Sequence, residues 1–282
     1  MRKLGVCREA AFVASRVLCM VALLTLVSRA LLAQSMWVNQ QQKGGLALEF
    51  LRPTFDGDPD YSMLTGVYVI SFRTPISERM SLIGELPLVH VSFNDSFLGD
   101  FSDDAVGNPY IAIATGSADE GTVVEIGAHL PLAGEGDGGV VFGYFGDFDR
   151  FEMYMPEAAS LGVLLGHKRR SASGTFSRMR VGPRLHISTG SGDEDMEASL
   201  AYGFAGGFEN RKGSASLGIT GRWLMTQDGG TLAENTIHQL TLDLAHRLGP
   251  VRAGLQLRVP VDSDLDDIIK HVVGLSVTLP FN

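Results

Sequence analysis

The last strand of the chain decides the fold: Val273-Gly274-Leu275-Ser276-Val277-Thr278-Leu279-Pro280-Phe281. Every second residue is apolar, and the residues between them are Gly, Ser, Thr or Pro. Successive side chains of a strand point to opposite faces, so one face here is apolar and the other is small or polar. A half-buried soluble strand can alternate in this way. A whole chain of such strands behind a secretory leader is more typical of a transmembrane β-barrel.

Residues 1–35 have the pattern of a cleaved signal peptide. Basic residues precede an apolar core at 17–27, and Ala33 or Ser35 offers the small residue that cleavage requires. The apolar core is too short to span a bilayer, which takes about 20 helical residues. Cys7 and Cys19 both lie in this leader, so the mature chain has no thiol for a disulfide or a metal. We expect residues 36–282 to form one barrel domain.

The charge balance excludes some classes of partner. The whole chain has a net charge of −9, and the leader holds five basic residues and one acid, so the mature chain is more acidic still. Nucleic-acid binding requires basic patches, so no nucleic acid is expected. No apolar segment after the leader is long enough for a membrane helix. A membrane location therefore requires a closed barrel, which leaves no backbone group unpaired in lipid.

An all-β, antiparallel barrel of about twelve strands fits the rest of the sequence. The candidate strands, each long enough to cross a bilayer at a tilt, are 44–54, 62–74, 79–93, 107–117, 120–132, 158–168, 176–189, 195–208, 213–226, 236–247, 250–260 and 268–281. Short and long connections alternate, and acids gather in the long ones. The segment 133–157 is the one connection where something other than a barrel strand could sit. The rival fold is a soluble periplasmic β-sandwich.

Period-two alternation also separates the lumen from the lipid. Guanidinium groups are costly in lipid, by about 2–4 kcal/mol each at the midplane, so the arginines must face inward. The predicted lumen-lining residues are Glu49, Glu125, His129, Arg178, Arg180, Arg184, His186, Glu197, Arg222, Asp243, Arg252 and Arg258. Glu85 is expected to join these acids. These charges could pair and close the lumen, or the arginines could line a path for anionic or polar solutes.

The segment from Phe142 to Tyr154 is unusually aromatic for a connection. We expect a constriction or mouth loop whose aromatic residues are Phe142, Tyr144, Phe145, Phe148, Phe151 and Tyr154. Acids and an arginine are interleaved with these rings. The segment could fold inward as a constriction, or collect aromatic ligands at the mouth. The alternative is an outer lid packed on neighbouring strands.

One cluster has the pattern of a hydrolase. His186 and Ser188 resemble the His-x-Ser arrangement of outer-membrane phospholipase and lipid A deacylases. Those enzymes attack lipid, whereas alternation with Leu185 and Ile187 places this pair in the lumen. A lipid hydrolase therefore stays a minor alternative, and we expect no enzyme and no catalytic residue. We also expect no cofactor and no metal site, since Asp262–Asp267 lacks the glycine of a calcium loop.

Three short motifs carry a family resemblance. They are Gly-Asn-Pro-Tyr-Ile-Ala-Ile at 107–113, Glu-Leu-Pro-Leu at 85–88 and the last strand ending on Phe281. The chain resembles transporter-like bacterial outer-membrane barrels associated with meta-pathway degradation of phenol. This resemblance implies import of small apolar compounds across the outer membrane.

We therefore expect a barrel in the cell outer membrane that passes small polar, anionic or aromatic solutes. Its expected partners are outer-membrane lipid, lipopolysaccharide, the barrel-insertion machinery and the solute. The alternative is a closed barrel with a structural or surface-interaction role that uses its acidic loops.

Overall fold

The computed structural model describes residues 44–56, 60–95, 99–116, 120–135, 138–190, 196–226 and 235–280. These residues belong to one compact unit. The predicted signal peptide, 1–35, lies outside the described residues, so the leader and the domain boundary after it stay predictions.

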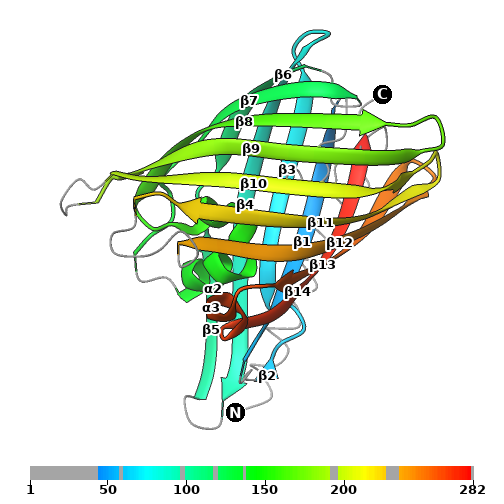
Figure 1. Cartoon of the computed structure of the whole chain (residues 1–282). Coiled ribbons are helices and arrows are strands. Elements are labelled where there is room, and N and C mark those ends of the chain that lie inside the picture. Colours follow the sequence, from blue (N-terminus) through cyan, green and yellow to red (C-terminus); the bar gives the residue numbers. More distant parts are fainter. Residues whose placement is uncertain are drawn as a thin grey trace. The chain divides into compact units, whose positions relative to one another are not determined.

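The strands form one antiparallel sheet that closes on itself (Figure 1). They are β1 (Gly45–Phe55), β2 (Asp60–Tyr61), β3 (Gly66–Pro75), β4 (Met80–Asp95), β5 (Gly99–Val106), β6 (Tyr110–Gly116), β7 (Gly121–His129), β8 (Ala158–Arg170), β9 (Thr175–Ser188), β10 (Met196–Glu209), β11 (Gly213–Leu224), β12 (Thr236–Leu248), β13 (Val251–Pro260) and β14 (Ile269–Pro280). Each of the longer strands pairs with its sequence neighbours.

Two pairings close the barrel. The first strand, β1, pairs with the last, β14, and β4 pairs with both β5 and β6. Val106 of β5 lies opposite Leu88, and Tyr110 of β6 lies opposite Glu85, so β5 and β6 are one barrel strand interrupted at 107–109. The short β2 only extends the edge of β4. The wall therefore has twelve strands, which confirms the predicted all-β barrel.

One connection differs from the prediction. Residues 94–106 were expected to form a loop, but β4 and β5 pair from Leu88–Val106 to Asp95–Gly99. Asp100, Asp103 and Asp104 therefore stand on a strand. Backbone hydrogen bonds hold such a hairpin whatever the polarity of its side chains. Where a hairpin extends beyond the lipid, it needs no apolar face, so the period-two signal is lost there.

The two faces of the wall have opposite chemistry. Large apolar side chains on the outer face are exposed, with Leu217 at 62% and Leu275 at 53%. Inward-facing charged side chains are buried, with Arg180 only 6% exposed. This is the reverse of a water-soluble protein, because here the apolar face needs lipid and the closed wall satisfies its own backbone groups. The barrel is therefore a transmembrane barrel of the outer membrane.

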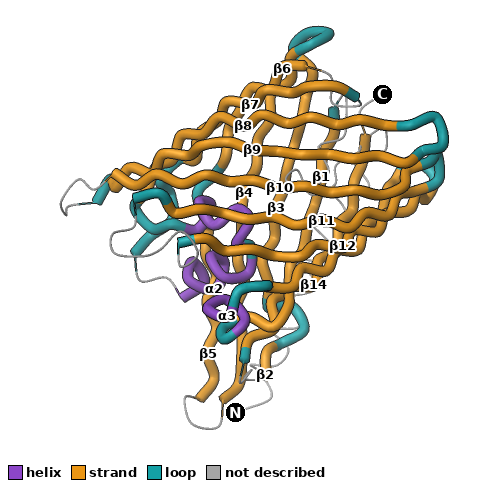
Figure 2. The backbone as a smooth tube through the Cα atoms, viewed as in Figure 1, coloured by secondary structure: helices purple, strands orange, loops and turns teal. Residues whose placement is uncertain are grey.

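Two helical elements lie in the connection between β7 and β8. They are α2 (Gly138–Gly146) and the 3-10 helix η1 (Phe148–Tyr154), and a short α3 (Ser263–Asp266) joins β13 to β14 (Figure 2). A Cβ at Gly143 would lie only 2.4 Å from the ring of Tyr154, so glycine is what allows α2 to approach η1. Within the described part of the chain, no helix is long and apolar enough to cross a membrane.

Residues 138–154, here named the plug, fold into the barrel rather than over its rim. All the residues of η1 are buried. Val140, Phe142 and Met153 of the plug join a core with wall residues such as Leu51 and Val67. The apolar part of the barrel interior is therefore completed by the plug.

Candidate functional site

The predicted arginines all lie on one part of the barrel interior. Alternation along β9, β11 and β13 turns them inward, and every one is less than a tenth exposed: Arg178, Arg180, Arg184, Arg222, Arg252 and Arg258. We name the inner face of these three strands the arginine wall. Asp243 of β12 lies among them and accepts a hydrogen bond of 2.9 Å from Gln256 Nε2.

Buried acids occupy a different part of the interior. Glu49 of β1, Glu85 of β4 and Glu125 of β7 are all buried, and we name the inner face of these strands the acid wall. Glu125 joins the two walls, because Arg180 Nη2 lies 3.8 Å from its carboxylate. Its carboxylate also accepts a hydrogen bond of 2.8 Å from Tyr110 Oη.

The remaining predicted lumen residues are two histidines and Glu197. His129 is buried and its Nδ1 lies 2.7 Å from Ser160 Oγ. His186 is also buried, and its Nε2 lies 2.9 Å from Ser199 Oγ. Glu197 pairs with His186 across β9 and β10, so it shares the inner face. Its side chain is exposed because it stands at the end of β10.

The acids of the plug meet the arginine wall. Glu152 binds Arg222, and Arg184 Nε lies 3.2 Å from the same carboxylate. Asp147 binds Arg258 Nη1 at 2.5 Å. Both plug carboxylates are fully buried, with exposures of 0–1%. Arg184, Arg222 and Arg258 thus have acids of the plug as their counter-ions.

Asp149 makes a third contact with the arginine wall. Its Oδ1 accepts a hydrogen bond of 2.6 Å from Thr220 Oγ1, and its other oxygen lies 3.6 Å from Arg258 Nη1. Arg222 Nη2 donates to the carbonyl oxygen of the same residue, at 2.9 Å. Backbone and side chain of η1 are therefore both fixed to β11.

Arg150 of the plug points to the acid wall. Its Nη1 lies 2.9 Å from Glu49 and 3.8 Å from Glu85, and its Nη2 lies 2.6 Å from Asp147. The plug therefore presents carboxylates to the arginine wall and a guanidinium to the acid wall. Each set of charges on the plug faces the opposite charge on the barrel.

The ion pairs hold two of the plug acids, Asp147 and Glu152, in their charged form. Burial by itself raises the pKa of Asp147, but Arg150 and Arg258 outweigh it and hold that pKa below its ordinary value. Burial acts in the same direction on Glu152, and Arg184 and Arg222 likewise hold its pKa far below the ordinary value. Breaking such a buried pair by removing one partner costs about 3–5 kcal/mol, because an uncompensated charge remains.

Aromatic rings of the predicted mouth loop surround these charges. The Phe151 ring lies 4.3 Å from the Arg222 guanidinium carbon and 5.7 Å from the His186 ring. Phe142 packs against Phe55 of the wall, with ring centroids 5.4 Å apart. Phe148 and Tyr154 are buried, and Tyr144 and Phe145 are partly buried against them. These rings therefore pack within the barrel.

Asn108 fixes the base of the plug. It lies in the interruption between β5 and β6 and is fully buried. Its Nδ2 donates to the carbonyls of Glu152, Met155 and Ala158, at 3.0, 2.7 and 3.3 Å. Its Oδ1 accepts from the backbone amides of residues 132 and 133, at 2.8 Å each. One side chain thus ties the barrel wall to both ends of the inward-folded connection.

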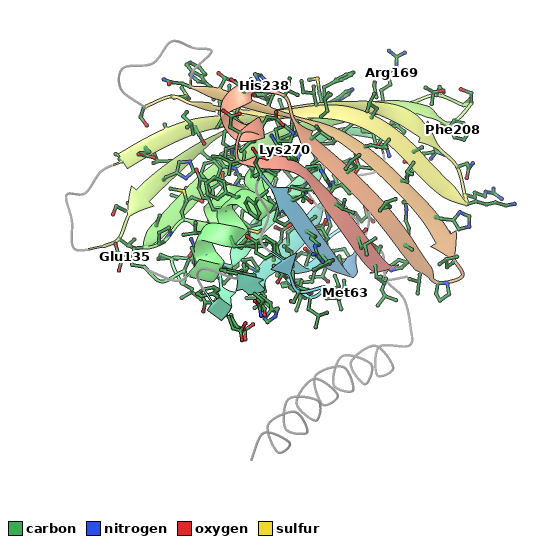
Figure 3. All side chains as sticks on the ribbon, turned by 90° about the horizontal axis from the view of Figure 1, so that it is seen from below. Met63, Glu135, Arg169, Phe208, His238 and Lys270 are labelled. Atoms are coloured by element: carbon green, nitrogen blue, oxygen red, sulfur yellow. The ribbon has the colours of Figure 1, made fainter. Side chains whose placement is uncertain are left out.

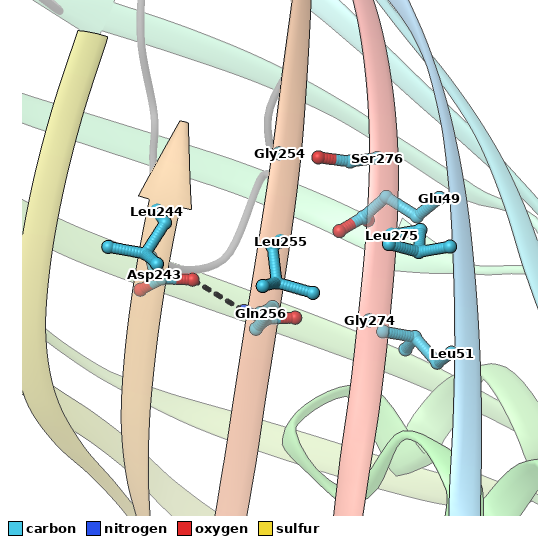
Figure 4. A pocket seen from close by; sticks show the side chains of 10 residues that line it. All are labelled: Glu49, Leu51, Asp243, Leu244, Gly254, Leu255, Gln256, Gly274, Leu275 and Ser276. Atoms are coloured by element: carbon cyan, nitrogen blue, oxygen red, sulfur yellow. Dashed lines mark hydrogen bonds between the residues drawn. The ribbon is translucent and has the colours of Figure 1, made fainter. Parts of the chain in front are cut away.

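Two cavities that are lined by charged residues of the interior are small. A cavity of about 20 Å³ lies beside Glu49, Asp243 and Gln256, where Gly254 and Gly274 contribute no side chain (Figure 4). A second cavity of the same size lies beside Glu85, Glu125 and Arg150. Each has room for about one water molecule. Neither of these two cavities has room for more than a small molecule such as water.

Comparisons with known proteins identify the fold. No protein-family model matches the chain, and no curated protein sequence is similar to it. The chain is similar to the structure of an outer membrane channel from Pseudomonas putida F1, with 12% identity, a TM-score of 0.57 and coverage of 84% of this chain and 94% of that one. The protein has the fold of an outer-membrane β-barrel.

Two further structures resemble the barrel less closely. The NanC porin has 9% identity, a TM-score of 0.49 and coverage of 84% of this chain and 100% of that one. LpxR from Salmonella typhimurium has 8% identity, a TM-score of 0.45 and coverage of 85% and 100%. Similarities at this level do not indicate a function for this chain.

The sequence reasoning missed the partners of the arginines in this barrel. The sequence analysis placed Asp147, Asp149 and Glu152 among the acids of the long connections and left open whether this segment folds inward; all three are buried against the arginine wall. One feature of the sequence indicated that acids outside the strands pair with the arginines. The strands supply more inward-facing arginines than inward-facing acids. The role of Asn108 had no such signal. Among the described residues, no group of three or more His, Cys, Asp or Glu is placed to hold a metal ion.

Proposed function

We propose that the protein passes small solutes across the outer membrane and that the plug closes this passage. The observation that carries the proposal is the matching of plug and wall charges. Glu152 and Asp147 meet the arginine wall while Arg150 meets the acid wall. The named structural neighbour from Pseudomonas putida F1 is a channel, which supports a passage function for this fold.

The charged interface between plug and wall favours a movable plug over a permanent one. Replacing buried ion pairs by well-packed apolar residues is often neutral or stabilising, so charges are a poor choice for a permanently closed core. Charges on both surfaces would, however, be well solvated once the plug left and water entered. The apolar contacts of Val140, Phe142 and Met153 with the wall oppose that separation, so only the ion-paired part of the interface favours it. The barrel wall needs no help from the plug to close, because its strands pair all the way round.

The arginine wall determines which solute charge we expect the open passage to prefer. Rings of Arg or Lys in a pore select anions, so Arg178, Arg180 and Arg184 would favour anionic or polar solutes. The family resemblance to barrels associated with phenol degradation implies aromatic solutes as well. Outer-membrane lipid, lipopolysaccharide and the insertion machinery are the other partners we propose.

A closed structural barrel is the second candidate. It is favoured by the burial of the arginine and acid walls and by the ion pairs that fill the space between them. A lipid hydrolase has less support, because the hydroxyl bound to His186 belongs to Ser199 of β10 rather than to Ser188.

A reversible lock on the plug tests the proposal. A Cβ on Gly139 of α2 would lie 2.8 Å from the Cβ of Ala105 on β5, so cysteines at both positions can form a disulfide after a small adjustment. The mature chain is expected to have no other thiol. The double variant Ala105→Cys, Gly139→Cys is refolded and inserted into a planar bilayer, and its conductance is recorded before and after reduction.

We expect no conductance from the oxidised protein and discrete conductance steps after reduction. The matched control, Ala105→Ser with Gly139→Ser, adds similar bulk without a bridge and should be insensitive to reductant. Steps that are equal in the oxidised and reduced protein would show that the plug does not close the passage. Silence of inserted protein in both states, and of a variant whose residues 138–154 are replaced by a short Gly-Ser linker, would favour the closed structural barrel.

A further inference from the structure

The barrel interior is polarised across its width, apart from two buried residues: Arg73 on β3, between β1 and β4, and Asp243 on β12, between β11 and β13. Buried guanidinium groups on β9, β11 and β13 face one side of the plug, and buried carboxylates on β1 and β4 face another. The plug matches both within six consecutive residues, from Asp147 to Glu152. Residues 147–152 therefore occupy the barrel interior as a ligand would, with charges of both signs, and we call this stretch the tethered ligand because it is part of the chain.

The contacts of the tethered ligand define two subsites. In the first, Arg184 and Arg222 bind the single carboxylate of Glu152, and Phe151 packs its ring under Arg222. In the second, Glu49 and Glu85 converge on the Arg150 guanidinium, at 2.9 and 3.8 Å. The first subsite takes an anionic group and the second takes a cationic group.

A solute that replaces the plug must satisfy both subsites. A simple anion would pair with the arginines but would leave Glu49 and Glu85 without the guanidinium group that Arg150 of the plug supplies. A simple cation would pair with the acids but would leave Arg184 and Arg222 without the carboxylate that Glu152 supplies. Charges of like sign that face each other without a counter-ion disfavour binding. A molecule with one group of each sign compensates both walls at once, as the plug does.

We infer that the passage selects small zwitterionic solutes, with the carboxylate at Arg184 and Arg222 and the cationic group at Glu49 and Glu85. This inference rests on the proposed function, because it describes the same passage with the plug displaced. Amino acids and short peptides belong to this chemical class. The packing of Phe151 under Arg222 shows that an aromatic ring beside the carboxylate is also accommodated.

Solute entry into proteoliposomes tests the inference. The protein carries Asp147→Asn, Arg150→Gln and Glu152→Gln, which neutralise the plug and leave both walls intact. The probes are γ-aminobutyrate as the zwitterion, succinate as the dianion and arabinose as the neutral solute, with entry followed by osmotic swelling. We expect γ-aminobutyrate to enter about fivefold faster than arabinose, which corresponds to one solvated ion pair.

The walls are then tested in the same background. Glu49→Gln with Glu85→Gln should abolish the advantage of γ-aminobutyrate over arabinose and favour succinate. The matched control is Asp56→Asn with Asp266→Asn, two exposed acids beside Lys270 at the rim, and it should change neither ratio. Folding of every variant is checked by its heat-dependent migration in detergent gels.

The possible outcomes separate the inference from the proposed function. Entry of arabinose without any preference for γ-aminobutyrate, or a preference that survives Glu49→Gln with Glu85→Gln, would overturn the zwitterion inference and leave the passage function standing. If the neutral plug stays docked, the Gly-Ser linker variant without residues 138–154 gives the same comparison. No entry of any probe through either variant would overturn the passage function, and the inference with it.

Discussion

Glu152 of the plug is bound by Arg222 of β11, seventy residues further along the chain. The same carboxylate also receives Arg184 of β9, at 3.2 Å. One buried carboxylate is therefore shared by two buried guanidinium groups, which lie on strands separated by β10. This relationship makes the plug a structural part of the arginine wall, and four predictions follow from contacts of this kind.

Loss of the Glu152 carboxylate should destabilise the docked plug. We expect Glu152→Gln to lower the free energy of unfolding by about 3–5 kcal/mol, because Arg184 and Arg222 lose their shared counter-ion. Urea unfolding of the refolded protein in detergent measures the change. The control Asp266→Asn removes an exposed acid 3.9 Å from Lys270 and should change stability by about 1 kcal/mol or less. Equal effects of the two substitutions would contradict the role of Glu152.

Asn108 should hold the plug at its base. We expect Asn108→Ala to cost about 3 kcal/mol, because several buried backbone groups lose their partner. The loosened connection should become accessible to trypsin after Arg150, in protein inserted in liposomes. Asn108→Asp tests the donor and the acceptor bonds separately. It keeps an acceptor for the amides of residues 132 and 133, and it loses the donor to the carbonyls of Glu152, Met155 and Ala158. A wild-type digestion pattern for Asn108→Ala would show that other contacts suffice.

The arginines of β9 should control ion selectivity in the open state. Arg180→Gln with Arg184→Gln should shift the reversal potential under a salt gradient towards cations, because Glu125 and the acid wall then dominate the interior. The matched control is Arg79→Gln with Arg169→Gln, two exposed arginines; Figure 3 shows Arg169 pointing away from the barrel. An unchanged reversal potential in the first variant would mean that these groups do not line the path.

Protonation of Asp147 and Glu152 should open the plug only below the ordinary range of carboxyl titration, whereas burial raises the pKa of Asp149. The pKa values of Asp147 and Glu152 are lowered in the folded protein by Arg150, Arg258, Arg184 and Arg222, against the effect of burial. Groups with lowered pKa values stabilise the protein fully above their unfolded pKa and lose that contribution as the pH falls through the folded value.

The conductance should therefore be constant from neutral pH to about pH 5 and rise below about pH 4. Recordings from the bilayer at a series of pH values measure this. In Glu152→Gln with Asp147→Asn the rise should be reduced, since the two titrating groups are gone. A rise that begins near neutral pH in the wild-type protein would assign the response to other groups.

The sequence by itself determined the wall of this barrel. Strand alternation depends only on backbone geometry, so period-two patterns correctly indicated which stretches are strands and predicted which way Arg180 or Leu217 points. The cost of a guanidinium in lipid then predicted which face is the interior. The hairpin of β4 and β5 escaped this reasoning because its paired residues, such as Asp103, carry no apolar face.

Only the tertiary structure decided what fills the barrel. An acid in a connection has the same local sequence whether it is solvated or buried, and Asp147 finds Arg258 across 111 residues of chain. The five side-chain hydrogen bonds of Asn108 likewise join segments that are distant in sequence. Local patterns predict local geometry, whereas the pairing of the plug with its two walls exists only after the strands have closed around it.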